Sequence, residues 1–302
     1  MDIGMIGLGR MGGNMAVRLS RGGHTVTAYD QNSTASQVCA DAGIATVQSL
    51  DELVDAIKAP RAIWAMVPSG AATEDIILNL ATVMSEGDTV VDGSNSNFND
   101  TIRRAEMLEQ KGIQFLDVGT SGGIAGLDVG YSLMVGGKRH AYDHLKPIFE
   151  TLAPSAETGY GHVGPSGAGH FVKMIHNGIE YGMMQAYAEG FELMSAKTEF
   201  DIDLAAVAEI WRYGSVVRSW LLDLTAIALS NDSSFSEIEP YVEDSGEGRW
   251  TVEESINLAV PIPVITAALQ ARFRSRQQSP FAPKLLAALR NHFGGHAVRE
   301  TL

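Results

Sequence analysis

The hydrophobic pattern of residues 1–163 alternates short runs of aliphatic and β-branched residues with longer amphipathic stretches. The runs that we expect to be strands are 2–6, 25–29, 62–67, 89–92 and 114–118, with a later pair near 132–135 and 157–162. Such alternation is typical of a parallel sheet that is covered by helices on both faces. The pattern therefore predicts a doubly wound α/β sheet for the first half of the chain.

From residue 164 onward the strand pattern disappears and helical periodicity takes its place. Helices are predicted over 171–197, 204–219, 221–229, 252–257, 263–275 and 282–293. The segment 163–169 separates the two patterns, and its Gly, Pro and Ser residues suit a domain junction. We predict two domains, residues 1–163 with the sheet and residues 164–302 with an all-α fold.

A glycine-rich turn, Gly7-Leu8-Gly9-Arg10-Met11-Gly12, directly follows the first predicted strand and leads into a helical stretch. Three glycines at this spacing allow a tight turn, a close approach of the backbone to a pyrophosphate, and close helix-to-strand packing. A chain with 32 glycines can also carry this spacing by chance, in an ordinary flexible turn. Here the second predicted strand ends at Asp30, where the fingerprint expects an acid. The segment predicts a Rossmann-like dinucleotide site.

Asp30 also indicates which dinucleotide is bound. A carboxylate at this place accepts hydrogen bonds from the ribose hydroxyls and repels the additional phosphate of NADP. The four residues after it, 31–34, contain no arginine that could hold that phosphate. NAD is therefore preferred over NADP. The expected cofactor contacts are Gly7, Leu8, Gly9, Arg10, Met11, Gly12, Asp30, Val67 and Asn95.

Composition and charge narrow the classes of partner. The 302 residues are 45% hydrophobic and carry a formal net charge of −14 without a cluster of Lys or Arg, so nucleic acid and anionic membranes are poor partners. Asp2 and Arg10 interrupt the apolar N-terminus and no apolar run is long enough to span a bilayer, so we expect a cytoplasmic protein. The single cysteine, Cys39, has no neighbour that would suggest a disulfide or a metal site.

The most informative stretch after the glycine turn is the predicted helix that begins near residue 168. One of its faces carries Lys173, His176, Asn177, Glu180 and Tyr181, and the opposite face carries Val172, Ile175, Ile179 and Met183. A solvated polar face is the ordinary explanation of such a pattern. The mixture of a base, an acid and amide donors directly after the domain junction favours a catalytic face instead.

Two loops after predicted strands are further candidates. Ser121-Gly122-Gly123 could bring its backbone close to a ligand, or it could be a plain surface turn. Asn95 follows the strand that ends at residue 92, where open α/β sheets place ligands, although an Asn there also suits a turn or a helix cap.

Together these segments resemble the β-hydroxyacid dehydrogenase superfamily and, within it, the 6-phosphogluconate dehydrogenase family. The resemblance covers 7–13, 92–101, 118–137 and 290–296. Its most specific part is residues 169–182, GHFVKMIHNGIEYG, because hydroxyisobutyrate dehydrogenases share the lysine but lack the His-Asn-Gly-Ile-Glu-Tyr run. One set of helices after the junction is similar to the short form of the family.

The resemblance implies oxidative decarboxylation of 6-phosphogluconate to ribulose 5-phosphate and CO2, with reduction of NAD, in the pentose phosphate pathway. It implies that Lys173 is the general base and Glu180 the acid that protonates the enediol, without a metal. The substrate contacts it implies are Asn95, Ser121, Gly122, Gly123, His176, Asn177, Tyr181, Arg272, Arg290 and His296. In this family the C-terminal tail reaches a neighbouring subunit's site, which implies a homodimer or homotetramer formed by residues 164–302.

One departure from the family pattern concerns the phosphate of the substrate. Ser245 stands where the long enzymes have a phosphate-binding lysine, and Glu247 replaces a threonine. The two arginines Arg272 and Arg290 can hold a phosphate through bidentate contacts, and Arg249 is a further candidate. An NAD-dependent dehydrogenase of an unphosphorylated acid, such as gluconate or 3-hydroxyisobutyrate, is therefore the alternative. A dinucleotide sensor without activity is a third hypothesis, which the Lys173 and Glu180 pair disfavours.

Overall fold

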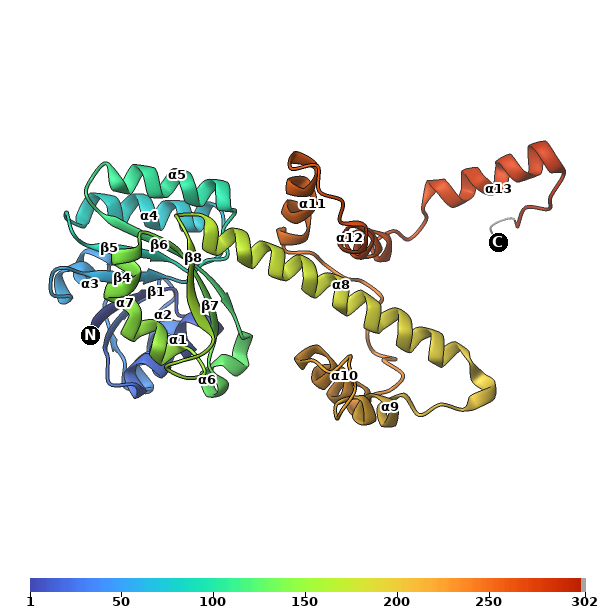
Figure 1. The fold of residues 1–302 in the computed structure, drawn as a ribbon, viewed down its shortest axis with the longest axis horizontal. Coiled ribbons are helices and arrows are strands. Elements are labelled where there is room, and N and C mark those ends of the chain that lie inside the picture. The colour runs from blue at the N-terminus through green and yellow to red at the C-terminus, as the bar shows by residue number, and fades with distance from the viewer. Residues whose placement is uncertain (300–302) are drawn as a thin grey trace. The chain divides into compact units, whose positions relative to one another are not determined.

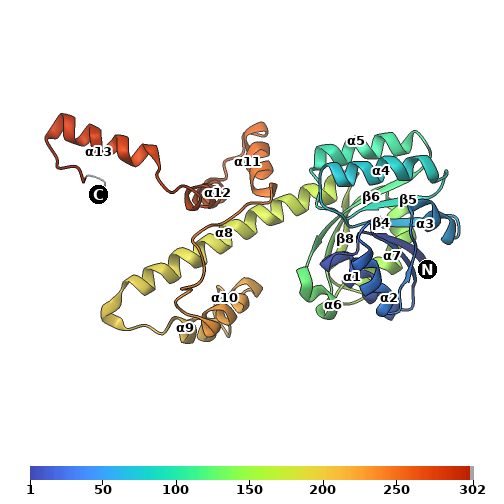
Figure 2. The ribbon, with the colours of Figure 1, turned by 180° about the vertical axis from the view of Figure 1, so that it is seen from behind.

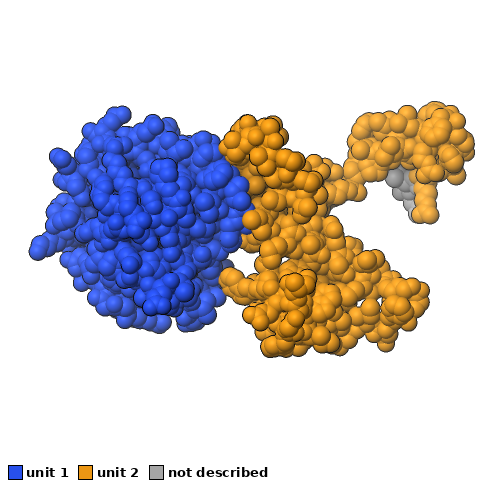
Figure 3. Space-filling view, in the orientation of Figure 1, with its two compact units in different colours: residues 1–177 blue, residues 178–302 orange. Residues whose placement is uncertain are grey.

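A computed structural model describes residues 1–299 of the chain. The chain divides into two compact units, Met1–Asn177 and Gly178–Leu302, which Figure 3 shows in different colours. We call them unit 1 and unit 2. The boundary between the two units lies inside the long helix α8 (Ala168–Ala196). The domain boundary expected at 163/164 stays a prediction.

Unit 1 contains one sheet of eight strands in the order β3-β2-β1-β4-β5-β6-β7-β8. The strands are β1 (Asp2–Ile6), β2 (Thr25–Tyr29), β3 (Ala45–Thr46), β4 (Ala62–Ala65), β5 (Thr89–Asp92), β6 (Gln114–Ser121), β7 (Ser132–Gly137) and β8 (Tyr160–Gly164). The order reverses beside β1, which creates a switch point between β1 and β4 where such sheets bind ligands. The predicted α/β class is confirmed.

The sheet departs from the expected parallel arrangement at one place, because β7 runs antiparallel to β6. A parallel neighbour needs a long crossover, whereas β6 and β7 are joined only by a short 3₁₀ turn, η1 (Gly123–Ala125), and the one-turn helix α6 (Gly126–Val129). The chain therefore reverses direction here, and β8 then returns parallel to β7 after helix α7 (Arg139–Leu152).

Helices cover both faces of the sheet, as Figures 1 and 2 show. One face is packed by α7, α1 (Arg10–Arg21) and α2 (Ser33–Asp41), with Met15, Leu19 and Phe149 in its core. The other face is packed by α3 (Leu50–Ala56), α4 (Ala71–Val83) and α5 (Phe98–Glu109). Both faces of the central strands are thus buried, which explains why these strands read as continuous apolar runs.

Unit 2 is helical, as predicted. The long helix α8 (Ala168–Ala196) enters it and is followed by η2 (Thr198–Phe200), α9 (Leu204–Trp211), α10 (Trp220–Asn231), α11 (Glu247–Asn257), α12 (Pro263–Ser275) and α13 (Phe281–Gly294). The helix predicted over 204–219 ends early, because Gly214 adopts a left-handed φ of 76° and Ser219 then caps the next helix through Leu222 N–H. No helix within residues 1–299 is long and apolar enough to cross a membrane.

Candidate active site

The glycine turn between β1 and α1 has the geometry that its sequence predicts. Gly7 adopts a left-handed φ of 86° and donates its N–H to the Tyr29 carbonyl at 3.0 Å. A Cβ at Gly12 would lie 1.9 Å from the Gly7 carbonyl oxygen, so α1 can start this close to β1 only without a side chain there. A Cβ at Gly9 would meet nothing within 4 Å, so the backbone is open toward a ligand on that side.

Asp30 is held in place at the end of β2. Its Oδ2 accepts the Leu8 N–H at 2.6 Å, and its Oδ1 accepts the Asn32 N–H at 2.7 Å. Each carboxylate oxygen retains a lone pair for another donor, such as a ribose hydroxyl. Asp30 therefore both closes the glycine turn and offers acceptors beside it.

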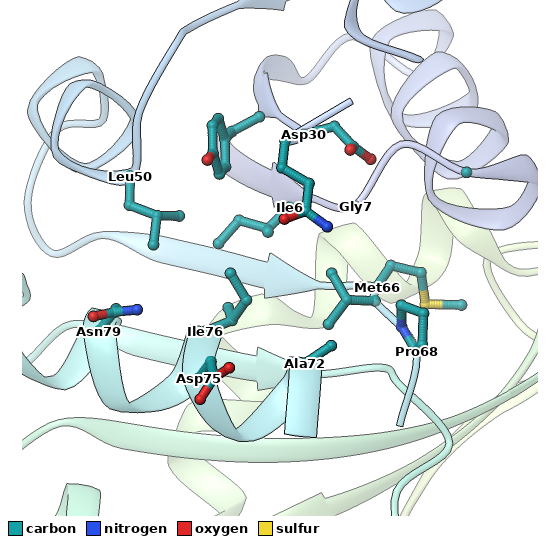
Figure 4. A pocket seen from close by; sticks show the side chains of 14 residues that line it. Ile6, Gly7, Asp30, Leu50, Met66, Pro68, Ala72, Asp75, Ile76 and Asn79 are labelled. Carbon is teal, nitrogen blue, oxygen red and sulfur yellow. The ribbon is translucent and has the colours of Figure 1, made fainter. Parts of the chain in front are cut away.

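A pocket of about 640 Å³ opens beside the glycine turn. Figure 4 shows Gly7 and Asp30 on one side of it and residues of α4 on the other. Of the predicted cofactor residues, Gly7, Gly9, Asp30 and Val67 line this pocket, whereas Leu8, Arg10, Met11, Gly12 and Asn95 do not.

Sequence reasoning missed the α3 and α4 wall of this pocket. It is made by Leu50, Ala72, Asp75, Ile76 and Asn79. Ala72, Ile76 and Asn79 are spaced i, i+4 and i+7, so they share one face of α4, but this pattern also fits a helix that packs only against the sheet. With an aliphatic wall, a fixed carboxylate and an open backbone, the pocket fits the adenosine half of a dinucleotide.

Asn95 lies just beyond the carboxyl end of β5, as expected, and has a left-handed φ of 52°. Buried Asp92 holds the residues on both sides of it: Oδ1 accepts the Ser94 N–H at 2.9 Å, and Oδ2 accepts the Ser96 hydroxyl at 3.0 Å. The loop that carries Asn95 is therefore tied to the strand it leaves.

The start of α8 is anchored on β6. The buried Asp117 carboxylate accepts the N–H groups of Gly167 at 2.8 Å and His170 at 2.9 Å, which are donors that the first turn of a helix leaves open. A Cβ at Gly119 would lie 2.4 Å from the Lys173 Cβ, so the helix packs directly on the strand at the lysine. Lys173 is 7% exposed as a result, and the solvated-face explanation does not hold at this residue.

Four of the predicted residues meet beside this anchor. His176 Nδ1 lies 3.5 Å from Lys173 Nζ and 3.0 Å from Asn177 Oδ1, and its Nε2 lies 3.4 Å from the Ser121 hydroxyl. The amine, the imidazole, the amide and the hydroxyl form one polar cluster at the carboxyl end of β6. We call it the lysine cluster; it combines a base with donors and acceptors for hydroxyl or carboxylate groups.

In unit 2 the structure brings Tyr181 and Arg272 together. The Arg272 guanidinium lies 3.6 Å from the centre of the Tyr181 ring, and its Nη1 donates to the Glu243 carbonyl at 2.8 Å. The Tyr181 hydroxyl accepts the Ser245 N–H at 3.3 Å. These contacts place a cation beside the Ser245 segment, and phosphate binding by Tyr181 and Arg272 stays a prediction.

The two substitutions in this segment form a pair of their own. The Ser245 hydroxyl donates to the Glu247 carboxylate at 2.5 Å, and Glu247 is buried. Arg249 donates instead to Asp244 at 2.6 Å and, with Arg276, lowers the pKa of that carboxyl. Because Arg249 is engaged in this ion pair, the segment gains no additional free cation from it.

The remaining predicted residues, Glu180, Arg290 and His296, lie on α8, on α13 and just after α13. Among residues 1–299 no hydrogen bond or ion pair joins Arg290 or His296 to Tyr181 or Arg272, and no residue of α13 is buried. In the same part of the chain no cluster of His, Cys, Asp and Glu could hold a metal ion.

Comparison with known proteins identifies the family. Residues 2–163 match the NAD binding domain of 6-phosphogluconate dehydrogenase, and residues 169–281 match the C-terminal domain of that enzyme. The chain belongs to the 6-phosphogluconate dehydrogenase family. The predicted family, its dinucleotide-binding fold and its dehydrogenase class are thereby confirmed.

The similarity extends over nearly the whole length of two relatives. An NAD(+)-dependent, decarboxylating 6-phosphogluconate dehydrogenase of Haloferax volcanii is 44% identical over 299 residues, 99% of this chain and 98% of the relative. YqeC of Bacillus subtilis is 41% identical over 99% of this chain and 100% of YqeC. The solved 6-phosphogluconate dehydrogenase of Plasmodium falciparum is 29% identical with a TM-score of 0.84, and all of this chain matches 66% of it. The chain thus resembles the short members along their whole length.

Proposed function

We propose that the protein catalyses the NAD-dependent oxidative decarboxylation of 6-phosphogluconate to ribulose 5-phosphate. The observation that carries the proposal is the lysine cluster. A nearly buried lysine amine lies beside an imidazole, an amide and a hydroxyl, at the same edge of the sheet as the glycine turn. This arrangement suits the removal of a proton from a substrate hydroxyl.

Lys173 Nζ acts first as the general base. It takes the proton of the 3-hydroxyl while the hydride leaves C3, and NAD, when bound, accepts that hydride. The product of this step is a 3-keto acid. The Lys173 ammonium then donates a hydrogen bond to the ketone oxygen, which stabilises the charge that develops there as the bond to the carboxylate breaks.

Carbon dioxide leaves, the electron pair of the broken bond forms a double bond between C2 and C3, and the ketone oxygen takes the proton of Lys173, which gives an enediol. Glu180 then donates a proton to C2 while Lys173 takes back the proton of the 3-hydroxyl, which gives the ketose product. Lys173 and Glu180 lie seven residues apart on α8, two turns along one face of the same helix.

The remaining side chains hold the substrate. The residues that we assign to its hydroxyls and carboxylate are Asn95, Ser121, Gly122, Gly123, His176 and Asn177. Tyr181 and Arg272 bind the phosphate, and Arg290 and His296 of a neighbouring subunit complete its site. Asp30 binds the ribose of NAD, and its negative charge disfavours a 2′-phosphate.

The exposed surface of α13 supports the proposal that a neighbouring subunit contributes to the site. None of its residues is buried, and it exposes five large apolar side chains, Phe281, Leu285, Leu286, Leu289 and Phe293. A large exposed apolar face of this kind marks a surface that binds another molecule. We infer that a second copy of the chain supplies that surface in a homodimer or homotetramer.

The segment of Ser245 and Glu247 favours a second candidate function, oxidation of an unphosphorylated sugar acid. A buried carboxylate at this place makes phosphate binding less favourable than a lysine would. The two functions are separated by measuring NADH and CO2 formation with 6-phosphogluconate, gluconate and 3-hydroxyisobutyrate, each with NAD and with NADP. We expect one CO2 per NADH and a strong preference for 6-phosphogluconate with NAD. NADH formed without CO2, or a preference for gluconate, would contradict the proposal.

A further inference from the structure

The carboxyl end of β5 holds a buried ion pair that none of the assignments above uses. Asp92 is fully buried, Arg104 of α5 is 1% exposed, and Arg104 Nη1 lies 3.3 Å from Asp92 Oδ2. Burying two charges is costly even when they pair, so such a pair is a poor source of stability compared with apolar packing. Its position beside Asn95 points to another use.

The pair fixes the loop of Asn95 from both sides. Asp92 binds Ser94 N–H and the Ser96 hydroxyl, and Arg104 Nη1 also donates to Ser96 Oγ at 3.1 Å. Asn95 between them is held at φ 52°, a conformation that costs a non-glycine residue about 1 kcal/mol. The loop keeps this conformation because its flanking residues are held in place.

The other edge of the same guanidinium binds α4, the helix that forms one wall of the cofactor pocket. Arg104 Nε donates to Glu74 Oε2 at 2.8 Å, and Nη2 donates to the Gly70 carbonyl at 3.4 Å, just before α4. The next residue along α4, Asp75, lines the pocket together with Ile76. One planar side chain therefore connects the wall of the pocket to the loop of Asn95.

Helix α5 also holds the start of α8. One turn before Arg104, the Thr101 hydroxyl lies 2.7 Å from His170 Nδ1, three residues before Lys173. The edge-on rings of Phe98 and Phe171 pack nearby, with their centres 5.3 Å apart. The loop of Asn95 and the lysine helix are thus attached to the same helix.

We propose that Arg104 is a positioning residue, which fixes Asn95 relative to the cofactor pocket and the lysine cluster through Asp92, Ser96 and Glu74. The inference rests on the proposed function for the identity of the substrate. The position of the loop is independent of the proposed function, because a crystal structure of the variant protein shows that position directly.

The chain contains a matched control at the opposite end of the same strands. Arg61 Nη1 lies 3.2 Å from the buried Asp88 Oδ2, and Asp88 also accepts the N–H groups of Arg61 and Ser85. This pair stands before β4 and β5, at the amino ends of the parallel strands, away from the glycine turn and Asn95. Like the Asp92 and Arg104 pair, it joins an arginine to a buried aspartate, but it lies far from the loop of Asn95.

The test compares Ser96→Ala and Arg104→Lys with Arg61→Lys. A lysine keeps the charge but cannot bind both Asp92 and Glu74 as the planar guanidinium does. Loss of one hydrogen bond to a charged group corresponds to about a tenfold change, so we expect Ser96→Ala to raise the KM for 6-phosphogluconate about tenfold. The Kd for NADH should stay within twofold. Arg104→Lys should also lower kcat, and Arg61→Lys should lower the Tm without changing KM.

Two outcomes would overturn the positioning role. One is an unchanged KM in Ser96→Ala with the φ of Asn95 unchanged in its crystal structure. The other is an equal rise of KM in Arg61→Lys, which would make the effect one of general stability. Failure of the proposed function is distinct, because the wild-type protein would then not turn over 6-phosphogluconate, while the φ of Asn95 could still be compared.

Discussion

Units 1 and 2 differ in how far each completes its own packing. Unit 1 buries a core on each face of its sheet, and its buried charges Asp92, Asp117 and Arg104 all have partners. Unit 2 buries two small clusters, around Leu222 and around Leu269, and leaves many large apolar side chains exposed.

The difference teaches where each part of the site acquires its geometry. The glycine turn, Asp30 and the lysine cluster are held by contacts inside unit 1, so they are fixed by this chain alone. Arg290 and His296 belong to a part of unit 2 whose apolar face is not covered by any of residues 1–299. We therefore expect cofactor binding to be independent of assembly and substrate turnover to depend on it.

The largest expected effect comes from removal of the base. Lys173→Met should lower kcat by about 10³- to 10⁴-fold, because a positioned general base contributes about that much and this lysine also polarises the ketone. NADH binding, followed by fluorescence, should stay within twofold, since the pocket does not include Lys173. Lys138→Met, on the exposed surface of unit 1, is the control and should leave kcat unchanged. Retention of a tenth of the activity in Lys173→Met would rule out this role.

A change in α13 tests the incomplete side of the comparison. Leu286→Glu together with Leu289→Glu places two charges on the apolar face of this helix, so the assembly should dissociate and kcat/KM should fall about 100-fold. Light scattering after size exclusion measures the mass, and NADH fluorescence should show unchanged cofactor binding. Lys284→Glu on the same helix is the control. An active monomer would show that the site is complete within one chain.

Mixed assemblies sharpen the same test. If Arg290 acts in a neighbouring subunit's site, a mixture of Lys173→Met and Arg290→Ala subunits forms some sites with both groups intact. Activity should therefore return in part, to about a quarter of the wild-type value in an equal mixture that exchanges freely as dimers. A mixture as inactive as its two components would show that the two residues serve the same subunit's site.

A medium effect is expected at the cofactor pocket. Asp30→Ala removes an acceptor for the ribose and the partner of Leu8 N–H, so the KM for NAD should rise about 10- to 50-fold. The preference for NAD over NADP should narrow, because the charge that repels the 2′-phosphate is gone. Initial rates with both cofactors measure this, with Asp41→Ala on the neighbouring helix as the control. A KM that rises equally for both cofactors would leave Asp30 only the turn-closing role.

Sequence patterns predicted those features whose cause is local. The strands, the glycine turn with Asp30, and the polar face of Lys173 all follow from residue type and spacing. The direction of β7 does not, because a strand that is covered on both faces has the same apolar pattern whether it runs parallel or antiparallel to its neighbour. The wall of α4 and the role of Arg104 were missed for a related reason, since an arginine on an amphipathic helix does not reveal which carboxylate it will meet.

The exposed residues of α8 mark the other limit. Ile179 and Met183 were expected on its apolar stripe, yet they are 51% and 38% exposed. Periodicity predicts which side chains share a face of a helix, but it does not say whether the chain itself covers that face. In unit 1 the sheet provides the cover, whereas in unit 2 the same kind of pattern is left open.

The smallest expected effect concerns the charges that unit 1 satisfies internally. The hydrogen bond from Arg103, reinforced by Arg104, lowers the pKa of Glu74 to about 2 from an ordinary 4.5. A carboxylate with a depressed pKa adds stability that is complete above about pH 4.5 and is lost as the pH falls toward 2. After allowance for solvent screening the contribution is about 1 kcal/mol. Glu74→Gln should therefore flatten the decline of the unfolding free energy between these pH values, measured by denaturant titration, whereas Glu157→Gln in an exposed turn should not. If Glu74→Gln leaves the pH dependence of the unfolding free energy unchanged, the network around Arg104 contributes no charge-dependent stability. The network would then hold the loop of Asn95 through its hydrogen bonds alone.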